Sequence, residues 1–176
     1  FIATAPDDAQ RRVLRNLMRG AHVIVDALLG TGTARPIEGD MAAVLRAVAA
    51  EIEKRRERKP PTLASLSAPL NEAVRPPLLV GVDGPTGMNY DTGELDPVAL
   101  AVDLSVTFAY PKLGHLRFPA ASACGELIVA DIGTDPKFAS DVALEVADRT
   151  MVRSLLPPRP LNAHKGTFGK VMIVAG

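Results

Sequence analysis

The sequence predicts an α/β fold in which helices cover a mainly parallel sheet, and three observations support this prediction. Short apolar, β-branched segments recur along the chain and are separated by tens of residues, which is the spacing of parallel βαβ units. Hydrophobic residues make up 47% of the chain but aromatic residues only 4%, so the core must be aliphatic. Two apolar segments end in an aspartate and a glycine-rich turn, and ligands of open parallel sheets bind at such strand ends.

The first elements are expected to be a helix and a strand. Residues 7–20 carry four apolar side chains at helical spacing: Val13, Leu14, Leu17 and Met18. Asp7 is placed to cap this helix and Gly20 to end it. Residues 22–29 (HVIVDALL) are too short for a globular helix and are rich in β-branched side chains, so we predict a buried strand there.

The longest helix is predicted over residues 39–59, which are rich in alanine and end in a basic run suited to a helix C-terminus. Further strands are predicted at residues 78–83, 103–110 and 126–131. Because crossovers between parallel strands are right-handed, these elements together predict a Rossmann-like three-layer sandwich. The proline-rich residues 60–77 are interpreted as a loosely ordered insertion.

The last residues of the chain change in character. Residues 154–170 form a proline-punctuated connector. KVMIVAG (170–176) is then predicted to be a further buried strand, the first strand of a second domain. Since the sequence starts at Phe1 rather than at a methionine, we expect it to be a segment of a longer chain.

Charge and composition exclude several classes of partner. The 20 basic residues balance 20 acidic ones, so the chain lacks the basic surface that nucleic acids and anionic membranes require. No apolar run approaches the ~20 residues of a membrane span, and we expect a cytoplasmic protein. The single cysteine, Cys124, cannot form an internal disulfide and is interpreted as a small buried filler.

Asp26 and Asp83 are the candidate functional residues that the strand pattern singles out. Each follows an apolar strand, in VIVDALLGTG and GVDGPTG, and precedes glycines that let backbone amides approach a ligand. Each could instead cap the turn that follows, which is a common use of aspartate. GTGTAR (30–35) lacks the third glycine of the dinucleotide fingerprint, although its amides, hydroxyls and arginine could hold phosphate. The residues alone therefore indicate a nucleotide-like ligand near two carboxylates.

Four blocks resemble the NAD(P)H-hydrate epimerase family, the YjeF N-terminal domain. They are DALLGTGTARP (26–36), VDGPTGMNYDTGE (82–94), VTFAYPKLGH (106–115) and GELIVADIG (125–133). AHKGTFGKVMIVAG (163–176) separately resembles the opening of the ADP-dependent NAD(P)H-hydrate dehydratase domain, which has a ribokinase-like fold. The resemblance implies that residues 1–150 are the C-terminal part of an epimerase domain. It implies that residues 151–176 are a linker and the start of a dehydratase domain, within a bifunctional repair enzyme.

The resemblance also implies a reaction and a site. The epimerase interconverts the R and S hydrates of NADH and NADPH at carbon 6 of the nicotinamide ring, and the dehydratase removes water from the S form with ADP or ATP and magnesium. Asp26 and Thr86 would bind a potassium ion, and Asp83 would contact the hydrated ring as an acid/base group. The substrate-binding loop would be Gly30, Thr31, Gly32, Thr33, Ala34, Arg35 and Pro36. We further expect a homo-oligomer.

Some positions depart from the family pattern. Thr86 stands where serine is common and keeps the hydroxyl, whereas Gly84 stands where isoleucine is common and is expected only to loosen the turn. The family's N-N-G-G-D-G loop, which supplies a potassium ligand and much of the substrate site, is not among these residues.

Two other functions stay open: a non-catalytic YjeF-type binding or scaffold module, and a structural companion to the dehydratase. The presence of both aspartates and of the Thr86 hydroxyl favours catalysis. Lys112 is interpreted as a solvated loop lysine, with a structural or substrate-edge role as the alternative. The histidines are interpreted as surface or packing side chains: His22, His115 and His164.

Overall fold

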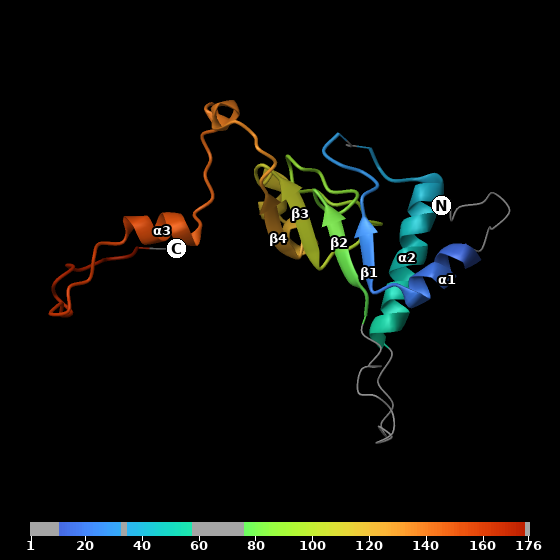
Figure 1. Ribbon diagram of the computed structural model, residues 1–176, viewed down its shortest axis with the longest axis horizontal. Helices are drawn as coiled ribbons and strands as arrows, with labels where there is room; N and C mark the ends of the chain where they lie inside the picture. The colour runs from blue at the N-terminus through green and yellow to red at the C-terminus, as the bar shows by residue number, and fades with distance from the viewer. Residues whose placement is uncertain (1–10, 33–34, 58–75, 175–176) are drawn as a thin grey trace, which may run out of the picture. The chain divides into compact units, whose positions relative to one another are not determined.

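The computed structural model describes residues 11–32, 35–57 and 76–174, and four of its segments form a parallel sheet (Figure 1). The strands are β1 (Val23–Asp26), β2 (Leu78–Val82), β3 (Leu104–Phe108) and β4 (Glu126–Ala130). They lie in chain order, and each pair of neighbours is parallel. The predicted α/β class and parallel sheet are therefore confirmed. Since the strands are parallel, their carboxyl ends all meet at one edge of the sheet.

Two helices come before β2 in the chain and lie on the β1 side of the sheet in Figure 1. The first, α1 (Arg12–Gly20), begins inside the predicted range 7–20, and the predicted cap Asp7 lies outside the described residues. The second, α2 (Gly39–Glu57), agrees with the predicted range 39–59 as far as the structure describes it. Most of the proline-rich stretch 60–77 also falls outside the described residues.

An aliphatic core joins α2 to one face of the sheet. Ile24 of β1 and Leu79 of β2 point to this face and pack against the helix. The buried members of the core are Met18, Ile37, Ala42, Leu45, Val48, Ile52, Leu79, Leu100 and Val102. None of them is aromatic, as the composition predicts, but a second, smaller buried cluster contains Tyr90 together with Met88, Ala120 and Cys124.

The opposite face of the sheet carries apolar side chains that are largely exposed. Successive side chains of a strand point to opposite faces, so the neighbours of Ile24 and Leu79 point away from α2. Val23, Val25 and Leu78 on this second face are 52%, 59% and 45% exposed. Helices α1 and α2 therefore form, together with the sheet, two of the three layers that the sequence predicts.

Residues Asp135–Gly176 form a compact unit separate from Phe1–Thr134. It contains a helix that the sequence patterns did not indicate, α3 (Arg149–Leu155). The carboxylate of Asp148 caps α3 by accepting a hydrogen bond of 2.7 Å from the Met151 N–H. A short 3-10 turn, Pro136–Ala139, lies before it in the same unit. The predicted division between residues 1–150 and 151–176 stays a prediction.

The strand predicted over residues 170–176, as the first of a ribokinase-like domain, is wrong for the part that the structure describes. Residues 171–174 form no strand, and their side chains are between 81% and 88% exposed. A strand needs a neighbour to pair with its backbone N–H and C=O groups, and none of the described residues supplies one. The apolar run alone therefore does not make a strand here. Within the described ranges, every helix falls short of the length or the apolar character that crossing a bilayer requires.

Candidate functional site

Asp26 and Thr86 meet at the carboxyl edge of the sheet, where the turn after β2 crosses the end of β1. The Thr86 N–H donates to Asp26 Oδ2 over 2.8 Å, and the Thr86 hydroxyl donates to Asp26 Oδ1 over 2.5 Å. The same hydroxyl oxygen accepts a hydrogen bond of 3.2 Å from the Leu29 N–H. Asp26 is 4% exposed and Thr86 is fully buried. Across the described residues, no lysine, arginine or histidine forms an ion pair with this buried carboxylate.

The backbone of Asp83 is held on both sides just beyond the end of β2. Its N–H donates to the Val106 carbonyl oxygen of β3 over 2.7 Å, and its own carbonyl oxygen lies 2.6 Å from His115 Nε2. Asp83 has a φ of 69°, a left-handed conformation that is uncommon for a residue other than glycine. The extended backbone of β2 therefore ends at Asp83. The direction of the Asp83 side chain depends on the contacts that surround it.

The side chain of Asp83 belongs to a polar cluster with Thr107 and Lys112. The Thr107 hydroxyl and the Lys112 ammonium each donate to Asp83 Oδ1 over 2.7 Å. Burial by itself would raise the pKa of Asp83, but the hydrogen bonds from Lys112 and Thr107 outweigh it and hold the pKa below its ordinary value. Asp83 is therefore a carboxylate at neutral pH. The interpretation of Lys112 as a solvated loop lysine is wrong, because its ammonium is bound to this cluster.

His115 is a packing histidine at only 4% exposure, and it links Lys112 to Asp83. The Lys112 N–H donates to His115 Nδ1 over 3.0 Å, so Nδ1 carries no proton and the Nε2–H donates to the Asp83 carbonyl oxygen. Burial lowers the pKa of His115, although its hydrogen bond with Asp83 works in the opposite direction. The ring is therefore neutral at neutral pH. His22 and His164, by contrast, are exposed.

Gly84 and Tyr90 are packed tightly beside this cluster. A Cβ atom at Gly84 would lie 3.0 Å from Met88 Cε, 3.1 Å from the Tyr90 hydroxyl and 3.2 Å from His115 Nε2. The expectation that Gly84 only loosens the turn is therefore incomplete, since it also leaves room for these side chains. Tyr90 is 5% exposed, and its hydroxyl has no hydrogen-bond partner among the described residues. Burial raises the pKa of Tyr90, and the carboxylates of Asp83 and Asp26 raise it further.

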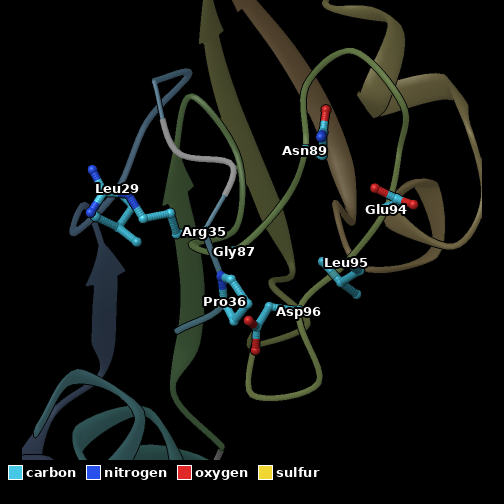
Figure 2. A pocket seen from close by; sticks show the side chains of 8 residues that line it. All are labelled: Leu29, Arg35, Pro36, Gly87, Asn89, Glu94, Leu95 and Asp96. Carbon is cyan, nitrogen blue, oxygen red and sulfur yellow. The ribbon is translucent and has the colours of Figure 1, made fainter. Parts of the chain in front are cut away.

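A cavity of about 180 Å³ lies between the predicted substrate loop and the segment after Thr86 (Figure 2). It is lined by Leu29, Arg35, Pro36, Gly87, Asn89, Glu94, Leu95 and Asp96. Figure 2 shows Leu29, Arg35 and Pro36 on one side, and Asn89 and Glu94 on the other. Asp96 ties the two sides together, because its Oδ2 accepts a hydrogen bond of 2.8 Å from the Ile37 N–H.

The predicted substrate residues fall into three groups. Arg35 and Pro36 line the cavity. Gly30, Thr31 and Gly32 are exposed and do not line it, while Thr33 and Ala34 lie outside the described residues. The sequence patterns missed Asn89, Glu94, Leu95 and Asp96, although these residues lie in or next to the block that contains Asp83. Neither Asp26 nor Asp83 lines the cavity; Leu29 and Gly87 connect it to the Asp26–Thr86 pair.

Comparison with known proteins adds to this geometry. The family described as "YjeF-related protein N-terminus" matches residues 3–114. The bifunctional NAD(P)H-hydrate repair enzyme Nnr of Thermofilum pendens is 36% identical over 154 residues, which are 88% of this chain and 24% of that protein. The enzyme of the same name from Coxiella burnetii is 33% identical over 162 residues, or 91% of this chain and 28% of that protein. The NAD(P)H-hydrate epimerase of Limosilactobacillus fermentum is 36% identical over 115 residues, or 65% of this chain and 44% of that protein. The chain thus spans about a quarter of the bifunctional relatives and less than half of the shorter one.

Proposed function

Because the chain belongs to the family of the YjeF-related protein N-terminus, we propose that it carries out the epimerase step of nicotinamide nucleotide repair. Its substrates would be the R and S hydrates of NADH and NADPH. The observation that carries the proposal is the ionised Asp83 at the carboxyl end of β2, held by Lys112 and Thr107 at the sheet edge where Asp26 also lies. Parallel sheets bind their ligands at this edge.

Asp83 would act on the hydroxyl group at carbon 6 of the nicotinamide ring. Epimerisation breaks the bond between this carbon and its oxygen and re-forms it on the opposite face, so no atom is gained or lost. The hydroxyl group would leave as water after taking a proton from solvent, and the ionised carboxylate would stabilise the positive charge left on the ring. When water adds to the opposite face, the carboxylate would accept the proton that this water loses and return it to solvent. The lowered pKa of Asp83 keeps it in the form that this role needs.

The phosphates of the substrate would lie near the loop before α2. Arg35 lines the cavity, and its guanidinium offers the forked donors that suit phosphate. The exposed Gly30, Thr31 and Gly32 add backbone amides and a hydroxyl. Since pockets for whole small ligands usually measure about 300–1,000 Å³, the cavity of about 180 Å³ would take only one part of a dinucleotide.

A potassium ion fits the donors around Asp26. Its carboxylate is buried and accepts hydrogen bonds from the neutral N–H and O–H groups of Thr86, and no cationic side chain of the described ranges pairs with it, so a cation would offset the cost of the buried charge. Asp26 and Thr86 supply the oxygen ligands that such a hard cation prefers. The Tyr90 hydroxyl is a further oxygen near both carboxylates. The bound ion would neutralise Asp26 and fix the turn that follows Asp83.

The parent protein would be bifunctional. This part of the proposal is supported by the names of the longer relatives and by the resemblance of residues 163–176 to the start of a dehydratase domain. ADP or ATP with magnesium would be the cofactors of that second activity. We expect the natural reading frame to continue for a few hundred residues beyond Gly176, and a stop codon near Gly176 would contradict the bifunctional assignment.

The epimerase proposal is tested with pure R hydrate and an excess of dehydratase, so that epimerisation limits the return of the nicotinamide absorbance. In the full-length protein, Asp83→Asn keeps the shape of the side chain but cannot accept a proton. General acid–base catalysis typically contributes ~10²–10⁴-fold, so the R-to-S rate above the spontaneous background should fall by about that factor. Binding of the hydrate should change far less, because Arg35 remains in place.

Two results would contradict the proposal. A wild-type protein that binds the hydrate without converting it would be a binding module. An Asp83→Asn protein with wild-type rates would show that Asp83 only caps its turn.

A further inference from the structure

The ammonium group of Lys112 donates three hydrogen bonds to other described residues. Its Nζ donates to Asp83 Oδ1 and to Thr107 Oγ1 over 2.7 Å each, and to the Phe108 carbonyl oxygen over 3.2 Å. A lysine ammonium has three N–H donors and no acceptor. Lys112 therefore has no donor left for a substrate, and its contacts are those of a residue that fixes its neighbours.

Both restraints on the carboxylate fall on the same oxygen of Asp83. The Thr107 hydroxyl accepts from Lys112 and donates to Asp83 Oδ1, so lysine, threonine and aspartate form a closed triangle. No hydrogen bond from the described residues reaches Asp83 Oδ2. The carboxylate thus has one occupied and one open oxygen.

The position of Lys112 is itself held firmly. Its backbone N–H and C=O both bond to His115, through Nδ1 at 3.0 Å and the His115 N–H at 3.1 Å. The opposite nitrogen of the same ring bonds to the Asp83 carbonyl oxygen. One buried histidine therefore sets the distance between the backbones of Lys112 and Asp83. The Lys112 side chain is only 27% exposed, unlike that of a freely moving lysine.

We propose that Lys112, supported by Thr107, is a positioning residue that holds Asp83 Oδ1 and so presents Asp83 Oδ2 to the reacting group of the substrate. This inference rests on the proposed epimerase function. It separates the two oxygens of Asp83 by role, and it makes Lys112 an electrostatic partner of the base rather than a proton donor to the substrate. Because Asp83 has a left-handed backbone conformation, its side chain depends on these contacts for its direction.

Removing the charge of Lys112 should have two effects. Lys112→Met keeps the length of the side chain but frees the carboxylate to rotate, and a misplaced catalytic group can cost about 10²-fold in rate. The loss should appear in kcat, with KM little changed, because Lys112 would make no contact with the substrate. The pKa of Asp83 should also rise, because burial would no longer be opposed by the ammonium. The acidic limb of the kcat–pH profile should therefore move to higher pH.

Three further variants complete the experiment. Lys112→Arg keeps the positive charge and should recover part of the rate and the original pH profile. Thr107→Val removes the hydroxyl but leaves the ion pair, so it should lower kcat less than Lys112→Met. Lys137→Met is the matched control, since Lys137 also pairs with an aspartate, Asp135, at 2.8 Å but is 70% exposed and belongs to the unit Asp135–Gly176 rather than to the one that contains Asp83. It should behave as wild type. Circular dichroism of each variant establishes that it is folded.

The outcomes separate this inference from the proposed function. A wild-type protein without epimerase activity would overturn the function itself. An active wild type whose Lys112→Met variant keeps its kcat and its acidic limb would overturn only the role of Lys112. An increase in KM with kcat unchanged would also overturn that role, because it would mean that Lys112 binds the substrate. If Lys112→Met does not fold, Thr107→Val and Lys112→Arg decide the question by the same pH profile.

Discussion

At the scale of single residues, the site contains two carboxylates whose electrostatic surroundings differ. Asp83 has a cation beside it and is ionised by that contact, whereas Asp26 accepts hydrogen bonds from the neutral donors of Thr86 and has no cationic partner in the part of the chain that the structure describes. A buried carboxylate without a cationic partner is costly, and a bound monovalent cation would relieve that cost. This difference is the reason why the proposed function assigns proton transfer to Asp83 and ion binding to Asp26.

The proposed ion-binding role of Asp26 predicts that potassium stabilises the folded protein. A ligand that binds only the folded state stabilises it by about 2.7 kcal/mol when its concentration is about 100 times its Kd. The melting temperature should therefore rise with potassium chloride but not with tetramethylammonium chloride at the same ionic strength. Thr86→Ser should keep this increase because the hydroxyl remains, and Asp26→Asn should abolish it. Equal melting temperatures in both salts would refute the ion site.

The structure places Asp26 next to Thr86, while their ion-binding role stays a prediction, and it contradicts the solvated position expected for Lys112. The resemblance pairs Asp26 with Thr86, and the parallel register that places Asp26 beside Gly81 brings the turn after β2 to the same point. Lys112 is 29 residues from Asp83 in the chain. It reaches Asp83 only because β3 lies next to β2 and a 3-10 turn, Leu113–Leu116, folds back beside it. Neither fact can be deduced from the local pattern of residues.

At the scale of elements, the strands and α2 follow from periodicity and composition, while the order of the strands does not. The apolar run Leu78–Leu79–Val80 predicts β2, but not that its two faces have different surroundings. Leu79 faces α2 and is 2% exposed, whereas Leu78 faces away and is 45% exposed. The strand predicted over residues 170–176 was wrong for a related reason, since pairing depends on neighbours that a single segment does not specify.

These neighbouring leucines provide a matched test of the two faces of the sheet. Leu79→Ala should destabilise the fold by about 2–5 kcal/mol, the usual cost of removing a buried leucine side chain. Leu78→Ala should cost about 1 kcal/mol or less, because nearly half of that side chain is exposed. Urea unfolding monitored by circular dichroism measures both. Equal losses would contradict the exposure of Leu78 and would mean that a third layer covers this face.

At the scale of the whole molecule, the contacts around Asp83 join three separate elements and so tie the local site to global stability. β2, β3 and the turn at His115 all converge there. His115 must be neutral for this arrangement, because its Nδ1 accepts the Lys112 N–H. Protonation of the ring would place a hydrogen on Nδ1 and break that bond. The folded state is therefore sensitive to pH through a single buried histidine.

The direction of this pH dependence follows from the lowered pKa of His115. Its ordinary value is 6.5, and burial lowers it in the folded state. Below about pH 6.5 the unfolded chain binds a proton that the folded chain does not, so stability falls with falling pH. Because one proton is involved, the free energy of unfolding cannot change by more than about 1.4 kcal/mol per pH unit. Asp83, whose pKa is lowered from 3.8, stabilises the fold above that value, and its contribution is lost only in stronger acid.

The free energy of unfolding, measured in urea between about pH 5 and pH 8, should therefore be nearly constant above the ordinary histidine pKa and should decline below it. His115→Gln should remove most of this decline at some cost in stability at pH 8, since glutamine cannot take up the proton. His22→Gln and His164→Gln are matched controls, because both histidines are exposed and should leave the slope unchanged. If the slope persisted in His115→Gln, the neutral histidine that links Lys112 to Asp83 could not be its source.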